Sequence, residues 1–302
     1  MLIANPISDT AFKILMDDSR IARFFIETIL EENISEVMVK PQEIAYQHGA
    51  NTDSLAASFG IFRLDFVATI KTGENDYKKV LIEIQKARKQ ADVMRFRKYL
   101  AEHYKKEDEV ITGDGKQIMI LPIVTIYLLG FNLPEVETAV VKINRQYIDC
   151  IDRKILTGKN DFIEKLTHDC FVVQIPRIEG RIQNKLDKLL SFFEQKYFID
   201  EGRMLKEYKL PIEGEEMKLI AERLNYIGTD RESRSQLDIE KEAYRVFYME
   251  MDQVEKDYKK SLEEIAKHKQ ELEEKEKALE EKEKALEEMA KELEQLKRQL
   301  NK

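Results

Sequence analysis

Two carboxylates, Asp65 and Glu83, lie in segments of this chain whose pattern favours metal chemistry. Residues 63–71 and 80–86 alternate apolar and polar side chains and are rich in Ile, Val and Phe, which is typical of strands. Residues 72–76, with the sequence Thr-Gly-Glu-Asn-Asp, have the composition of a turn. The three segments together predict a β-hairpin that carries one carboxylate on each strand.

The register of this hairpin decides whether its polar side chains meet. We expect a turn centred on Glu74, which places Asp65 opposite Glu83. The next polar pair on the same face is Arg63 with Gln85. Directly opposed residues have Cβ atoms about 4.5–5.5 Å apart, so two carboxylates repel each other there unless a positive charge lies between them. A divalent cation is the natural occupant. The alternative is a hairpin whose polar face is simply hydrated. The opposite face carries the apolar residues Phe62, Leu64, Phe66, Val80, Ile82 and Ile84.

A basic helix is predicted directly after the hairpin, over residues 86–106. Eight Lys and Arg residues stand there against two acidic ones, a local excess in a chain whose net charge is −8. Arg88, Arg95 and Tyr99 fall on one side of this helix, and the planar guanidinium of arginine suits bidentate contacts with phosphate. The alternatives are an ordinary solvated face or, for Tyr99, packing against the sheet. The residues expected to pack on the sheet are Val93, Phe96, Leu100 and Tyr104.

Composition sets limits on the class of protein. The 302 residues are 43% hydrophobic, enough for a sizeable core, and 36% charged, which indicates long exposed helices. The two cysteines indicate no disulfide framework, so we expect a cytoplasmic protein. The four histidines lack zinc-ligand spacing. The longest apolar run, 118–131, is too short to span a bilayer, so we expect no membrane association.

The order of predicted elements is helix, strand, hairpin, helix, strand, which favours a mixed α/β fold over a doubly wound one. Two N-terminal helices are expected, the first capped by Ser8 or Asp9 and the second by Ser19. Further strands are expected at 37–46, 118–129, 139–143 and 170–175, a polar loop at 107–116, and helices at 180–197, at 213–226 and from about 230.

The tail from about residue 250 has a heptad pattern. Leucine recurs every seven residues, at Leu272, Leu279, Leu286, Leu293 and Leu300. The companion positions hold Lys275, Lys282, Met289 and Leu296. We expect a dimeric coiled coil. The alternative is a solitary charged helix held by Glu–Lys pairs four residues apart, each contributing about 0.2–0.5 kcal/mol.

Several short stretches resemble one known family when they are taken in order. They are Ser8-Asp-Thr-Ala-Phe-Lys13, Arg63-Leu-Asp65-Phe, Ile82-Glu83-Ile-Gln85, Arg95-Phe-Arg-Lys-Tyr99, Thr167-His-Asp-Cys-Phe-Val-Val and Leu189-Leu-Ser-Phe-Phe193. This set is similar to the PD-(D/E)XK nuclease family transposases, which include recombination-promoting nucleases of bacteria. The resemblance covers about residues 5–230.

The resemblance implies a restriction-endonuclease-like core and a site for Mg²⁺ or Mn²⁺. Asp65 and Glu83, with the carbonyl of Ile84, would hold the metal, and Glu27 would add a carboxylate unless it is simply solvated. The family usually has Lys where this chain has Gln85, which would instead position the attacking water. The missing positive charge would come from Lys13 or Arg95, and Arg88, Arg95 and Tyr99 would contact DNA. Lys86 is expected on the opposite face of its strand.

The resemblance therefore implies a metal-dependent DNA endonuclease that acts in recombination, mobile-element or defence processes. Three segments are expected: a nuclease-like domain over 1–205, a helical extension over 206–250, and a charged helix over 251–302 that pairs two copies of the chain. The alternative is a catalytically idle nuclease fold that serves as a coiled-coil interaction or DNA-binding module.

Overall fold

A computed structural model describes residues 1–40, 66–74, 76–86, 90–112 and 115–300. It divides into two compact units, Met1–Tyr244 and Arg245–Lys302. Residues on both sides of position 205 belong to the first unit, so the boundary expected there does not separate the two units.

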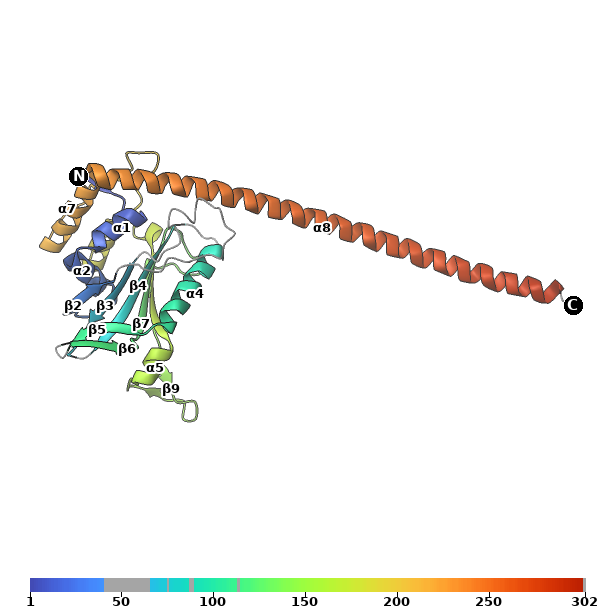
Figure 1. The fold of residues 1–302 in the computed structure, drawn as a ribbon, viewed down its shortest axis with the longest axis horizontal. Coiled ribbons are helices and arrows are strands. Elements are labelled where there is room, and N and C mark those ends of the chain that lie inside the picture. Colours follow the sequence, from blue (N-terminus) through green and yellow to red (C-terminus); the bar gives the residue numbers. More distant parts are fainter. Residues whose placement is uncertain (41–65, 75, 87–89, 113–114, 301–302) are drawn as a thin grey trace. The chain divides into compact units, whose positions relative to one another are not determined.

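A six-stranded mixed sheet is the centre of the first unit (Figure 1). In spatial order its strands are β2 (Glu36–Val39), β3 (Phe66–Lys71), β4 (Tyr77–Gln85), β7 (Ile123–Leu129), β11 (His168–Gln174) and β8 (Val140–Ile143). The strands β4, β7 and β11 are parallel to one another, and the outer pairings are antiparallel. The α/β class expected from the sequence is therefore confirmed.

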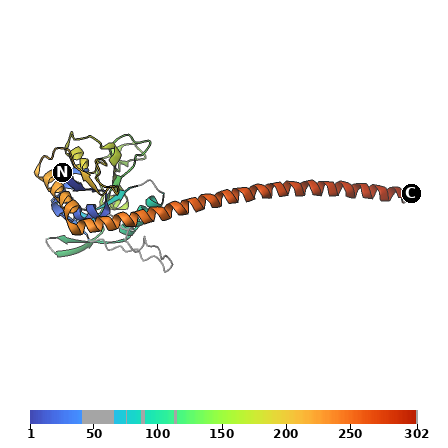
Figure 2. The ribbon, with the colours of Figure 1, turned by 90° about the horizontal axis from the view of Figure 1, so that it is seen from above.

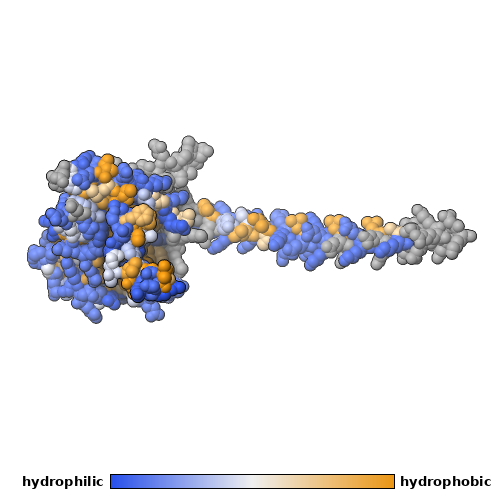
Figure 3. All heavy atoms as spheres, turned by 90° about the horizontal axis from the view of Figure 1, so that it is seen from below, coloured by the Kyte–Doolittle hydropathy of each residue, from blue (hydrophilic) through white to orange (hydrophobic). Residues whose placement is uncertain are grey.

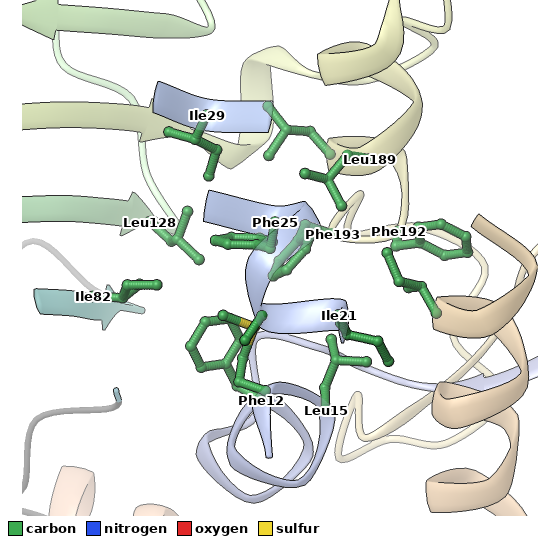
Figure 4. Packing of buried hydrophobic residues seen from close by; sticks show 14 of the residues in the cluster. Phe12, Leu15, Ile21, Phe25, Ile29, Ile82, Leu128, Leu189, Phe192 and Phe193 are labelled. Carbon is green, nitrogen blue, oxygen red and sulfur yellow. The ribbon is translucent and has the colours of Figure 1, made fainter. Parts of the chain in front are cut away.

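One face of this sheet, which we call the α1 face, is apolar along its central strands except for Lys78 near the start of β4, whose Nζ lies 2.5 Å from Glu32. Its apolar residues are Phe66, Ala68, Ile70, Val80, Ile82, Ile84, Val124, Ile126 and Leu128. Residues of four helices share the core of this face: α1 (Asp9–Met16), α2 (Ser19–Leu30), α6 (Lys185–Ser191) and α7 (Glu215–Thr229). In Figure 4, Phe12 and Phe25 from the first two helices lie against Phe193, and the ring centroids of Phe12 and Phe25 are 5.9 Å apart.

The opposite face, which we call the α4 face, is covered by α4 (Gln90–Lys105) (Figure 1). Its apolar cluster is small and consists of Val67, Leu81, Phe96, Tyr99 and Ile123, with Leu100 and Tyr127 packed against it. The expected packing of Phe96 and Leu100 is thus confirmed. Tyr104 is 37% exposed, and its hydroxyl lies 2.9 Å from Nδ1 of His168.

A second hairpin replaces the loop expected at 107–116. Its strands are β5 (Asp108–Thr112) and β6 (Gly115–Met119), and they pair antiparallel. Val110 is buried with Tyr77 and Leu121, which explains why this polar stretch forms strands. The single buried strand expected at 118–129 is also wrong: Ile118 belongs to β6 and is 72% exposed, and β7 begins only after Pro122.

Smaller elements complete the first unit. They are β1 (Leu2–Ala4) paired with β12 (Leu205–Glu207), β9 (Tyr147–Ile148) paired with β10 (Ile155–Leu156), α5 (Asp161–Leu166) and the 3₁₀ turn Ile175–Arg177. The helix expected at 180–197 is shorter, because Asn184 caps α6 and the helix ends at Ser191. Ser8 caps α1 as expected, but Asp18 rather than Ser19 caps α2, because its carboxylate accepts the Arg20 amide at 3.0 Å.

The helix α8 (Arg231–Leu300) begins near the expected residue and runs without a break into the second unit (Figure 2). Among the described helices, none is both long enough and apolar enough to cross a membrane.

Candidate functional site

The observed ladder between β3 and β4 has the register expected from the sequence. Phe66 pairs with Ile82 and Lys71 pairs with Tyr77, so the turn is centred on residue 74. The next step of this ladder would pair Asp65 with Glu83. Asp65 lies outside the described residues, so this pair stays a prediction.

The alternation of β4 divides its side chains between the two faces of the sheet. Ile82 and Ile84 pack into the core of the α1 face, so Glu83 and Gln85 point to the α4 face. Glu83 is 1% exposed and Gln85 is 7% exposed. Because removing a carboxylate from water is costly, a buried Glu on a central strand favours a specific role for it.

Tyr127 is the neighbour of Glu83 on β7 in the parallel register. Its ring packs against Phe96 with the centroids 4.4 Å apart. Burial raises the pKa of Tyr127, and the Cys170 and Glu83 groups raise it further. The phenol therefore stays protonated beside Glu83, where it can donate a hydrogen bond to a substrate or a carboxylate.

The end of β4 is held tightly against β7. The Gly130 amide donates to the carbonyl of Gln85 at 2.8 Å, and a Cβ at position 130 would lie 2.8 Å from the carbonyl oxygen of Lys86. Only glycine fits this close approach of two backbones without a shift. The backbone that carries Glu83 and Gln85 is thereby fixed relative to its parallel neighbour.

The candidate DNA contacts on α4 are only partly described. Tyr99 is 2% exposed and packs with Leu81 and Val67, so its ring belongs to the core of the α4 face. This agrees with the alternative in which Tyr99 packs against the sheet. Arg95 lies on α4 but its side chain is outside the described part, as is all of Arg88. The described basic side chains exposed on this helix or directly after it are Arg97, Lys98, Lys105 and Lys106.

Lys13 and Glu27 lie on the two N-terminal helices, which cover the α1 face rather than the face of Glu83. Oε1 of Glu27 accepts the amide of Ile34 at 3.0 Å, so this carboxylate anchors the chain that leaves α2. The structure therefore does not bring Glu27 into a cluster with Glu83. Among the described residues, no three His, Cys, Asp or Glu side chains form a group that could hold a metal ion.

Lys86 points away from Glu83, as the strand alternation predicts. Its Nζ lies 3.2 Å from Asp9 and 2.9 Å from Glu240, and 3.8 Å from the centre of the Tyr244 ring. This ammonium thus joins the end of β4 to α1 and to the beginning of α8.

Glu240 is the centre of this cluster and was not expected from the sequence. Its carboxylate accepts the Ser8 hydroxyl at 2.7 Å and the amides of Asp9 and Thr10 at 2.9 and 2.8 Å. Burial by itself would raise the pKa of Glu240, but the charge of Lys86 and these hydrogen bonds lower it to about 2. The motif that begins at Ser8 therefore has a structural role: it binds a carboxylate at the N-terminus of α1.

A buried ion pair on the α4 face was also missed. Nζ of Lys79 lies 2.6 Å from Oδ2 of Asp108, and Nζ of Lys40 lies 2.9 Å from Oδ1. Burial lowers the pKa of Lys79, although Asp108 opposes the shift. Burial, and then the charge of Lys79, lower the pKa of the neighbouring His103 to about 4. The alternation of β4 predicts that Lys79 faces α4, but no sequence signal names its partner.

Comparison with known proteins adds no relative: no family model, curated protein or solved structure matches the chain. Function must therefore be argued from the site. Its described donors, the Glu83 carboxylate and the Gln85 amide, are hard oxygen ligands of the kind that Mg²⁺ and Mn²⁺ prefer.

Proposed function

We propose that the chain is a metal-dependent endonuclease of the PD-(D/E)XK transposase-like type that hydrolyses DNA. The observation that carries the proposal is the burial of Glu83 on β4, one ladder step beyond the pairing of Phe66 with Ile82. In the sequence, Asp65 directly precedes Phe66, the first residue of β3. A restriction-endonuclease-like core is part of the same proposal, as is a cytoplasmic location.

The proposed roles follow from residue chemistry. Asp65, Glu83 and the carbonyl of Ile84 would hold Mg²⁺ or Mn²⁺, which lowers the pKa of water and polarises the scissile phosphate. Gln85 would orient the water through its amide, and Arg95 would neutralise the phosphate, since Lys13 lies on a helix that covers the α1 face. Glu27 is less suited to the metal, because its carboxylate already accepts the Ile34 amide.

DNA binding would rest on local charge, since the whole chain is acidic. The exposed bases Arg97 and Lys98 on α4, with Arg88 and Arg95, would contact phosphates without reading bases. The buried ring of Tyr99 would support this helix from beneath. We expect little sequence preference and a rate that falls as salt rises.

Plasmid cleavage tests the proposal. The full chain should nick supercoiled DNA in Mg²⁺ or Mn²⁺ and lose this activity with EDTA. Glu83→Gln and Asp65→Asn should each reduce the rate at least a hundredfold. Glu109→Gln is the matched control, because the Glu109 side chain is exposed and forms an ion pair only with Lys116 among the described residues. Unchanged cleavage by the Glu83 and Asp65 variants would reject the site.

A second candidate function, an interaction module built on the tail, has its own supporting observation. Tyr258, Ile265, Leu272, Leu279 and Leu286 recur every seven residues and are 59–67% exposed in the single chain. In Figure 3 apolar side chains recur along the described part of this helix between hydrophilic ones. We propose that this stripe pairs with a second copy of the chain. A metal titration separates the two candidates, since an idle nuclease fold would bind no Mn²⁺.

A further inference from the structure

A cavity of about 220 Å³ lies in the first unit, apart from the hairpin site. It is formed by Glu179 and Gly180, by the end of α6 and the chain after it, and by β12 with the residues that follow. The lining residues that matter here are Lys206, Tyr208, Ser191, Lys196 and Lys209. None of them has a role in the proposed nuclease.

Lys206 is the unusual member of this lining. The residue is 2% exposed, and Nζ donates to the carbonyl oxygen of Phe192 at 2.5 Å and also to that of Glu194. These carbonyls follow the last turn of α6, where helical partners are lacking. An ammonium has three N–H groups, and among the described residues the third meets no hydrogen-bond acceptor.

This geometry allows Lys206 to lose a proton without losing a hydrogen bond. The neutral amine keeps two N–H groups for the two carbonyls, and its lone pair takes the position of the third N–H. Burial lowers the pKa of Lys206 to about 7, although Glu194 opposes the shift. The amine is therefore substantially neutral at physiological pH, which is the form that attacks carbonyl carbon.

The other two lysines of the cavity are paired with carboxylates. Lys196 contacts Glu179, and Nζ of Lys209 lies 3.3 Å from Glu207. Lys206 has no carboxylate within ion-pair distance among the described residues. Because the charges at the rim are matched in this way, the cavity favours an uncharged ligand over an anion.

Tyr208 supplies a proton donor on the same side of the strand as Lys206, two residues further on. Its hydroxyl lies 2.7 Å from Oγ of Ser191, and its ring stacks on Phe192 with the centroids 4.6 Å apart. Burial raises the pKa of Tyr208, so the phenol stays protonated. It can give a proton to a developing alkoxide.

We propose that this cavity binds a small uncharged aldehyde, which condenses with the ε-amino group of Lys206 to form an imine. The nitrogen lone pair forms a bond to the carbonyl carbon, and the carbonyl oxygen takes a proton from the phenol of Tyr208. The nitrogen, which now carries two hydrogens and a positive charge, returns one proton to the Tyr208 phenolate and gives a neutral carbinolamine. The carbinolamine then loses its hydroxyl and the remaining proton on nitrogen as water, leaving the carbon–nitrogen double bond. No oxidant or reductant is needed.

Reductive trapping on the full-length protein tests the proposal. Propionaldehyde and cyanoborohydride are added at pH 7 for short times, and peptide mass spectrometry measures the labelling of each lysine. Lys206 should be labelled at least tenfold faster than Lys196 and Lys209, which lie beside the same cavity in the same chain. This advantage should shrink as the pH approaches 10, where exposed amines also lose their protons.

Two outcomes would overturn the proposal. Labelling of Lys206 no faster than that of Lys196 would mean that its amine only caps α6. Tyr208→Phe should slow the labelling of Lys206 several-fold and leave Lys196 unchanged; equal rates in the variant would remove the phenol from the reaction. Both measurements use folded chains that retain Lys206, so neither depends on a variant that removes the cap.

Discussion

The two faces of the central sheet differ in what they bury. On the α1 face the central strands bury only apolar side chains, and these belong to one large core with residues of α1, α2, α6 and α7. On the α4 face the same strands bury Lys79, Glu83 and Gln85 among a handful of apolar residues. Buried polar groups lower stability unless they are paired. The difference indicates that stability comes mainly from the α1 face, while chemistry is to be sought on the α4 face.

The largest effect is expected from truncating adjacent residues of β4. Ile82 and Leu81 are both fully buried, on the α1 and α4 faces respectively. Ile82→Ala should cost about 4 kcal/mol of unfolding free energy, and Leu81→Ala about 2–3 kcal/mol, because the small cluster around Leu81 can settle into the gap more easily than the large core around Ile82. Urea denaturation measures both. Equal losses of unfolding free energy in the two variants would contradict the view that the α1 face contributes more stability than the α4 face.

Breaking the buried ion pair should cost slightly less. Asp108→Asn leaves the ammonium of Lys79 buried beside a neutral amide, so we expect a loss of about 3 kcal/mol in urea denaturation. The double variant Lys79→Met with Asp108→Leu removes both charges and should recover most of this loss. If the double variant is as unstable as the single one, the charges are not the cause.

Acid titration should separate the two faces by pH. The pKa of His103 falls from 6.5 to about 4 on folding. The contribution of neutral His103 to the unfolding free energy is therefore complete above pH 6.5 and is lost as the pH falls through 4. The pKa of Glu240 falls from 4.5 to about 2 on folding. The contribution of ionised Glu240 to the unfolding free energy is therefore complete above pH 4.5 and is lost as the pH falls through 2. Each lowering of the pKa by about 2.5 corresponds to about 3 kcal/mol of unfolding free energy.

Urea midpoints at pH 7, 5 and 3 measure these two steps. His103→Gln should flatten the step between pH 7 and 5, and Glu240→Gln the step between pH 5 and 3. A single acid transition that neither variant changes would contradict both assignments.

Glu83→Gln should change stability by less than about 1 kcal/mol in either direction, because the amide keeps the shape of the side chain and removes a buried charge. Thermal unfolding of the variant beside wild type measures this. If the variant loses cleavage but keeps its stability, Glu83 serves chemistry rather than folding, as the comparison of the two faces predicts. A loss of several kcal/mol would instead make Glu83 part of the structural frame.

The smallest effect on unfolding is expected from removing residues 255–302, which belong to the second unit. The first unit should unfold within about 0.5 kcal/mol of its original free energy, since its core lies in residues 1–244. Sedimentation should show a dimer for the full chain and a monomer for the truncated one. A truncated chain that stays dimeric would place the pairing surface in the first unit.

Local patterns were sufficient for much of the fold. Alternation and the turn centred on Glu74 predicted the register of β3 and β4, and periodicity predicted α1, α2 and α8. They failed at 107–119, where hairpin and loop compositions are alike and the deciding contact is the burial of Val110 against Tyr77 and Leu121. They also overextended α6, whose ends depend on Asn184 and on the packing after Ser191.

The sequence by itself determined which residues could share a face: alternation places Glu83 and Gln85 together and opposite to Lys86, because successive side chains of a strand point to opposite sides. Only the tertiary structure decided their partners. Glu240 meets Ser8 across more than 200 residues of chain, and Lys206 meets the carbonyls that end α6. No local pattern encodes such contacts, since they arise only when distant elements pack and buried polar groups must find partners.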